Sequence, residues 1–130
     1  MRLPRLFVPL CLLVMAAGTS GAAAQSEIAG PLVAFAEDGA CRLEVHGNGK
    51  IFLIAATGMD AGESGRYLVA NGNMMPIDWN VTASADGRFA RYYMPFRFGR
   101  QGDTVTVSFA TGRCHVSTTF GWRRGIRVID

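Results

Sequence analysis

The side chains best able to form a covalent bond in this sequence are three cysteines, Cys11, Cys41 and Cys114. Cys11 lies in an amino-terminal segment that we expect to be removed, which leaves an even pair. An even number of cysteines in a small exported domain is typical of a disulfide. A bridge between Cys41 and Cys114 would close a loop of roughly 70 residues and restrict the unfolded chain by about 4 kcal/mol in the chain-entropy model. We therefore predict one disulfide and an oxidising compartment.

The remaining candidates for metal binding or catalysis are few. His46 and His115 complete a two-Cys, two-His set, but Cys114 and His115 are adjacent and would point to opposite faces of a strand. Asp60 and Glu63 share a glycine-rich loop, where a solvated turn is the simpler interpretation. The sequence contains neither a Gly-x-Ser-x-Gly elbow nor a His-Glu-x-x-His motif. We predict that the chain is not an enzyme and holds no metal or cofactor.

The first 24 residues have the three-part layout of a secretory signal peptide. Arg2 and Arg5 precede an apolar run from residue 6 to residue 17, and small residues then lead to an Ala-x-Ala site. The apolar run is about a dozen residues long, whereas a membrane span needs about 20. We expect cleavage before Gln25 and delivery to the periplasm or the exterior, with no stable membrane insertion afterwards. An uncleaved anchor is the alternative.

Charge is distributed unevenly over residues 25–130, which we expect to form a single domain. These residues hold 11 basic and 10 acidic side chains, a net charge of +1, which argues against nucleic acid as a partner. Residues 25–86 hold eight acidic and three basic side chains, whereas residues 87–130 hold eight arginines and two aspartates. The basic half could steer an acidic partner, or the two halves could neutralise each other on neighbouring strands.

Short segments rich in Val, Ile, Phe, Tyr and Thr alternate apolar with polar residues between glycine-rich turns. This pattern predicts an all-β domain. The expected strands span residues 32–36, 41–46, 51–56, 65–70, 77–84, 89–96, 104–110 and 114–122. About seven strands in roughly 100 residues favour an immunoglobulin-like antiparallel β-sandwich with one disulfide, and a small closed barrel is the alternative. The alternation directs the following side chains to the core, beside both cysteines: Leu43, Val45, Phe52, Ile54, Tyr67, Val69, Trp79, Val81, Val105, Val107, Phe109 and Val116.

The segment from residue 89 to residue 100 interleaves arginines with aromatic residues more densely than any other part of the sequence. Tyr and Arg are enriched at binding hot spots. Pro95 cannot donate a ladder hydrogen bond, so this strand should lie at a sheet edge or end there, and an exposed edge can bind an extended peptide. The alternative is that half of these aromatics are core and the arginines only solubilise the face. We predict a partner-binding surface made of Arg91, Tyr92, Tyr93, Arg97 and Arg100.

Several single residues give the chain a resemblance to the periplasmic curli-assembly proteins of the CsgC and CsgH type. They are the Cys41-x-Leu43-x-Val45 strand, the Gly65-Arg66-Tyr67 strand opening, Gly87-x-Phe89, and the Asp103-x-Val105-x-Val107 strand followed by Cys114. The resemblance implies a small immunoglobulin-like sandwich that keeps a curli subunit from forming amyloid before export. The Cys-x-Cys pair of the enterobacterial branch is absent here, so no redox role is carried over. The implied partner is an amyloid subunit, bound by a monomer.

Two alternatives remain open at this stage. The run Ser64-Gly65-Arg66-Tyr67 is similar to the Ser-Gly-x-x-Tyr loop of periplasmic inhibitors of C-type lysozyme, although it is one residue shorter and the expected aromatic-Lys-Gly segment is missing. In that case Ser64 and Arg66 would carry the activity. The other alternative is an accessory subunit of an envelope complex, which would co-purify stably with its partner.

Overall fold

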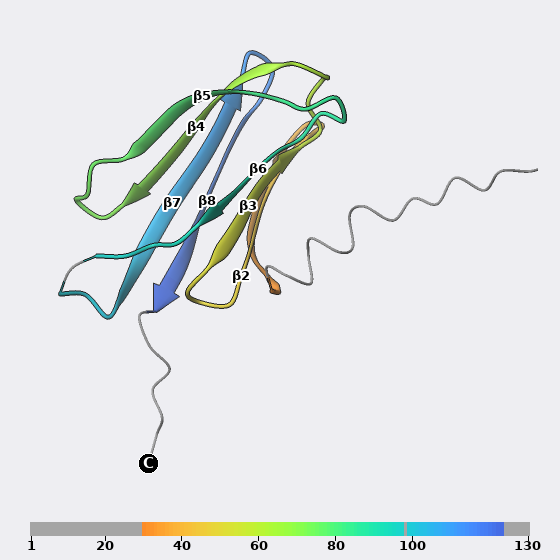
Figure 1. The fold of residues 1–130 in the computed structure, drawn as a ribbon. Coiled ribbons are helices and arrows are strands. Elements are labelled where there is room, and N and C mark those ends of the chain that lie inside the picture. Colours follow the sequence, from red (N-terminus) through yellow and green to blue (C-terminus); the bar gives the residue numbers. More distant parts are fainter. Residues whose placement is uncertain (1–29, 98, 124–130) are drawn as a thin grey trace, which may run out of the picture.

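The computed structural model describes residues 30–97 and 99–123, which form two antiparallel four-stranded sheets packed face to face (Figure 1). The predicted signal peptide, residues 1–24, lies outside the described residues. The all-β sandwich with one disulfide is confirmed, with eight strands rather than seven. The strands are β1 (Leu32–Asp38), β2 (Cys41–Gly47), β3 (Phe52–Thr57), β4 (Ser64–Asn71), β5 (Ile77–Thr82), β6 (Phe89–Tyr93), β7 (Gly102–Thr111) and β8 (His115–Arg123).

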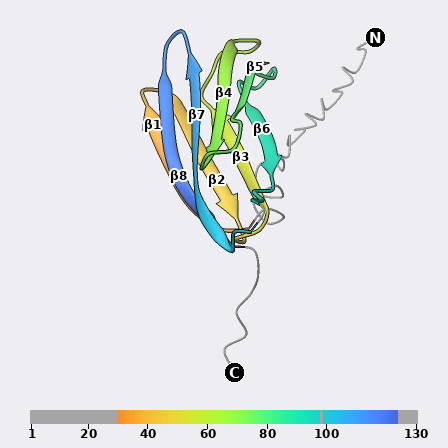
Figure 2. The same ribbon diagram turned by 90° about the vertical axis from the view of Figure 1, so that its left-hand side faces the viewer.

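The strand order is β1-β2-β3-β6 in one sheet, called sheet A here, and β5-β4-β7-β8 in the other, called sheet B. The chain crosses between the sheets after β3, β5 and β6, which is the Greek-key type of connection found in immunoglobulin-like sandwiches. On one long side of the molecule β1 lies against β8, and Figure 2 shows these two strands side by side. The opposite long side is bordered by the outer edges of β5 and β6.

Alternation along the strands builds the core between the sheets. In β2 the side chains of Cys41, Leu43 and Val45 are buried, whereas the intervening polar side chains are only half-buried. Burying an aliphatic side chain of this size contributes roughly 1.5–3 kcal/mol. Aromatic rings join the sheets, with the Phe52 and Phe120 centroids 4.5 Å apart. The side chains that the alternation directed inward are buried or half-buried with one exception, the edge-strand residue Trp79.

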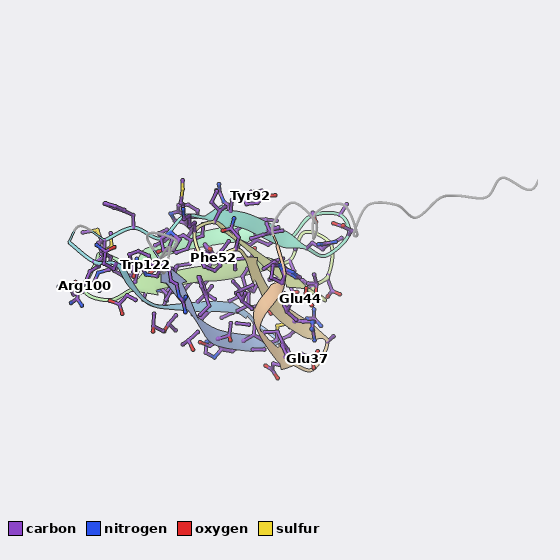
Figure 3. All side chains as sticks on the ribbon, turned by 90° about the horizontal axis from the view of Figure 1, so that it is seen from below. Glu37, Glu44, Phe52, Tyr92, Arg100 and Trp122 are labelled. Atoms are coloured by element: carbon purple, nitrogen blue, oxygen red, sulfur yellow. A yellow bond between two sulfur atoms is a disulfide. The ribbon has the colours of Figure 1, made fainter. Side chains whose placement is uncertain are left out.

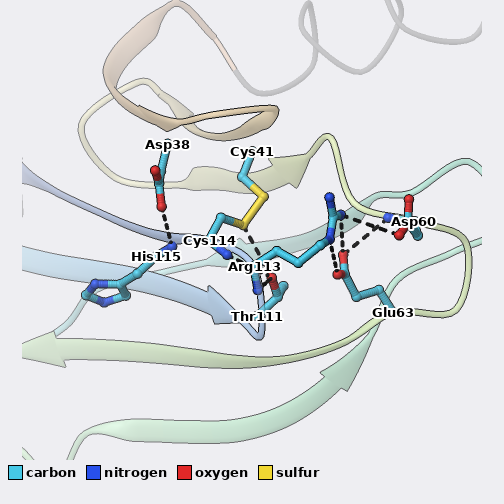
Figure 4. The surroundings of a disulfide bond; sticks show 8 residues. All are labelled: Asp38, Cys41, Asp60, Glu63, Thr111, Arg113, Cys114 and His115. Carbon is cyan, nitrogen blue, oxygen red and sulfur yellow. Dashed lines mark hydrogen bonds and ion pairs between the residues drawn. A yellow bond between two sulfur atoms is a disulfide. The ribbon is translucent and has the colours of Figure 1, made fainter.

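The predicted disulfide joins the two sheets near one end of the sandwich (Figure 4). Cys41 begins β2, and Cys114 immediately precedes β8, with their Cα atoms 6.3 Å apart and a sequence separation of 73. A side-chain oxygen of Asp38 accepts a 2.8 Å hydrogen bond from the backbone N–H of His115, which ties the end of β1 to the start of β8. The bridge and this hydrogen bond therefore both link sheet A to sheet B at this end.

Candidate protein-binding edge

The long side bordered by β5 and β6 exposes aromatic and cationic side chains at two unpaired strand edges. Tyr92 on β6 is 56% exposed, and Trp79 on β5 is 41% exposed. The guanidinium carbon of Arg91 lies 4.6 Å from the Trp79 ring centroid, so a cation–π contact connects the two sheets across this side. We call Arg91, Tyr92 and Trp79, together with the outer backbone edge of β6, the open edge.

Alternation along β6 explains how these side chains diverge. Phe89 and Tyr93 turn toward sheet B, and Arg91 shares their face but reaches the rim, where it covers Trp79. Tyr92 turns to the outer face of sheet A, opposite Leu53 of β3. Leu53 is only 7% exposed although it lies on an outer face, so both faces of β3 are shielded from solvent.

Two of the predicted binding residues make contacts that hold the fold. Tyr93 is half-buried with its ring edge-on to Phe120 at 6.4 Å. Burial raises the pKa of Tyr93, and a hydrogen bond with Asn71 opposes that rise. Asn71 is itself buried and accepts a 3.3 Å hydrogen bond from the indole N–H of Trp122. Tyr93 is therefore engaged with the core and contributes little surface to a partner.

Arg97 is the second predicted binding residue that contributes to the fold, because only 10% of its side chain is exposed. Its guanidinium pairs with the Asp103 carboxylate and donates to the side-chain oxygen of Asn73. Gly72 lies directly beneath it with a φ of +57°, and a Cβ at that position would collide with the guanidinium. Arg97 thus joins the β4–β5 loop to the β6–β7 loop.

Arg100 is exposed in the β6–β7 loop, and Figure 3 shows it well apart from Tyr92. The five predicted binding residues therefore separate into an edge pair, a core tyrosine, a loop-joining arginine and a distant exposed arginine. Sequence reasoning assigned Trp79 to the core and missed it as a surface residue. Its face was predicted correctly, but the edge position of β5 leaves the ring partly open to solvent.

The two oppositely charged halves of the chain neutralise each other at one point. Arg113 donates to Glu63 at 2.8 Å and lies 3.7 Å from Asp60, which lowers the pKa of Glu63. The other ion pairs of the described residues form within one half of the sequence: Arg42 with Glu37 and Glu44, His46 with Glu44, Arg66 with Asp78, and Arg97 with Asp103. Within the described part of the chain, Lys50, Arg88, Arg91, Arg100 and Arg123 form no ion pair with a carboxylate, although Arg88 interacts electrostatically with Asp86, and Arg100 with Asp103.

A shallow hollow of about 450 Å³ lies on sheet B toward the disulfide end. Its polar lining comes from Ser64, Arg66, Asn80, Thr82 and Thr111. Arg66 is held by Asp78, whose carboxylate accepts a 2.7 Å hydrogen bond from the guanidinium Nε. The hollow brings together the two residues that the lysozyme-inhibitor alternative singles out.

Comparison with protein-family models, with curated proteins and with solved structures returns no match. Among residues 30–97 and 99–123 there is no helix long and apolar enough to cross a membrane. The same residues contain no group of three or more His, Cys, Asp or Glu side chains placed to hold a metal ion.

Proposed function

We propose that this chain is an exported, non-enzymatic protein-binding module that transiently captures an extended, aggregation-prone chain in the periplasm, in the manner of a curli-type assembly chaperone. The observation that carries the proposal is the open edge. Among residues 30–97 and 99–123 no strand pairs with the outer side of β6, which is flanked by the exposed Tyr92 and by Arg91 stacked on Trp79.

The open edge has the properties that capture of an extended chain requires. Unpaired N–H and C=O groups of an edge strand can extend a ladder to an incoming strand. Tyr92 and Trp79 offer apolar contact area, and the Trp79 ring restricts the guanidinium of Arg91 before a partner arrives, which reduces the entropy lost on binding. A captured strand edge is withheld from the cross-β stacking that nucleates amyloid.

A fibril-growth assay with a curli-type subunit tests the proposal. We expect substoichiometric amounts of the protein to lengthen the lag phase, and the double variant Arg91→Ala, Tyr92→Ala to lose most of that effect. Arg123→Ala is the matched control for charge, because Arg123 is also exposed and forms no ion pair with a carboxylate among the described residues but lies on β8 of the other sheet. Fibrils that grow at the same rate with and without the wild-type protein would rule out the chaperone function. Equal inhibition by the double variant would rule out the open edge as the site.

The hollow on sheet B supports a second candidate, inhibition of a C-type lysozyme through Ser64 and Arg66. If it is correct, adding the protein should slow lysis of bacterial cell walls by such a lysozyme, and Ser64→Ala with Arg66→Ala should restore the rate. An unchanged lysis rate with the wild-type protein would remove this candidate.

A further inference from the structure

Exposed apolar side chains are concentrated at one end of the sandwich. The turns that follow β2, β4 and β6 lie at this end, along the bottom and lower left of the ribbon in Figure 1. This loop end comprises residues 48–51, 71–76, 94–97 and 99–101, the first residues of β1, and Arg123. Ten large hydrophobic side chains are exposed among the described residues, and Met75 and Met94 are the most exposed at 93% and 70%. Seven of the ten lie at the loop end: Leu32, Val33, Ile51, Met74, Met75, Met94 and Phe96. None lies in the turns of the opposite, disulfide end.

Charged side chains are also distributed unevenly between the two ends of the sandwich. Lys50, Arg100 and Arg123 lie at the loop end and form no ion pair with a carboxylate among the described residues. The nearby acid Asp103, at the start of β7, is bound by Arg97 and also interacts electrostatically with Arg100. The disulfide end instead carries the four acidic side chains of Asp38, Asp60, Glu63 and Asp86 against the two cations Arg88 and Arg113. The apolar tips are therefore surrounded by positive charge.

Contacts of Arg97 hold in place the two loops that carry the methionines. Arg97 bonds Asn73 in one loop and Asp103 at the base of the other. Within the loops, the N–H of Met74 donates to the Asn71 carbonyl at 3.2 Å, and the N–H of Arg100 donates to the Arg97 carbonyl at 3.1 Å. The methionine side chains thus project from ordered turns.

We propose that the loop end docks on an anionic phospholipid bilayer, with the methionine tips entering the headgroup region and the three cations contacting lipid phosphates. Apolar tips that project from loops suit a lipid surface, whereas an extended peptide pairs with an unpaired strand edge, and the outer strand edges on this side belong to β5 and β6 rather than to these turns. Exposed apolar side chains surrounded by Lys and Arg combine the two contributions that hold a peripheral protein on an anionic membrane. This docking uses residues outside the open edge and does not depend on the proposed function.

Flotation with lipid vesicles tests the proposal on the protein recovered after export. We expect it to float with phosphatidylglycerol vesicles, to stay behind with phosphatidylcholine vesicles, and to dissociate as salt is added. The double variant Met75→Glu, Met94→Glu should bind at least tenfold more weakly, and Lys50→Ala with Arg100→Ala should also weaken binding. The wild type and the variants differ only at the substituted residues, so any contribution of the rest of the chain to vesicle binding is the same in all of them.

Two matched controls separate the loop end from exposed residues elsewhere. Phe35→Glu changes an exposed apolar side chain in the middle of β1, and Arg88→Ala removes an unpaired cation at the disulfide end. Both should leave flotation unchanged, and urea unfolding should show every variant folded. The proposal is wrong if the wild-type protein does not float with phosphatidylglycerol vesicles. It is also wrong if the double variant Met75→Glu, Met94→Glu floats as well as the wild type. Loss of vesicle binding in the presence of equimolar polyglutamate would assign the surface to acidic protein partners instead.

Discussion

The guanidinium of Arg97 sits above Gly72, where a side chain is disfavoured for two reasons. A side chain at Gly72 would be strained by its φ of +57° and would also displace the half-buried Arg97. We predict that Gly72→Ala lowers the free energy of unfolding by about 2–4 kcal/mol, because the backbone strain is added to the loss of the Arg97 contacts with Asp103 and Asn73. Urea denaturation measures this change.

Gly39 provides the matched control for that prediction. Its φ of +58° imposes the same backbone strain, but a Cβ there would meet no atom within 4 Å. Gly39→Ala should therefore cost only about 1–2 kcal/mol. Equal destabilisation by the two substitutions would mean that contact with Arg97 adds nothing at Gly72.

Acid should destabilise the fold through Glu63, whose pKa is lowered chiefly by its hydrogen bonds from Arg113. A carboxylate with a lowered pKa in the folded state contributes stability at pH values above its unfolded pKa, near 4.3, and loses it as pH falls through the folded value. Thermal unfolding midpoints of the wild type should accordingly hold between about pH 5 and 7 and fall below about pH 4. Glu63→Gln should reduce that fall while changing the midpoint less at pH 3 than at pH 7. A wild type and variant with parallel profiles would contradict this assignment.

At the scale of strands, the sequence predicted where each strand lies along the chain but not which side chains and elements pack against one another. Alternation located every strand, and Pro95 indicated that β6 is an edge strand, although it ends at Tyr93 rather than at residue 96. Alternation does not indicate what covers the outer face of a sheet, so the burial of Leu53 on the outer face of β3 was not predictable. The burial of Arg97 was also missed, because an arginine is normally exposed and its partner Asn73 lies in another loop.

The disulfide links β2 to the start of β8. Its removal tests whether the bridge contributes only to stability or also to the inhibition of fibril growth. We predict that Cys41→Ala with Cys114→Ala lowers the free energy of unfolding by about 2–5 kcal/mol. Inhibition of fibril growth should persist wherever the variant remains folded, because the open edge lies on the opposite side of the sandwich. A folded variant that no longer inhibits would show that the bridge also shapes the binding surface.

At the scale of the whole molecule, the open edge and the loop end share no side chain, although they adjoin where Met94 follows the last residue of β6. Because the two proposed activities rest on different side chains, we expect them to be separable. We predict that Arg91→Ala with Tyr92→Ala leaves vesicle flotation unchanged, and that Met75→Glu with Met94→Glu leaves the fibril lag phase unchanged. Measuring both activities on both variants checks this. Joint loss in either variant would indicate one continuous surface.

The position of the disulfide also determines how the domain responds to force. A pull applied at Gly30 and Arg123 can unravel only the segments outside the bridge, roughly 20 residues or about 70 Å of extended chain, before the covalent bond bears the load. Strands β3 to β7 lie wholly inside the bridged loop. The open edge and the two methionine loops therefore lie in the part of the chain that the bridge protects from the pull, whereas Leu32, Val33 and Arg123 of the loop end lie outside it.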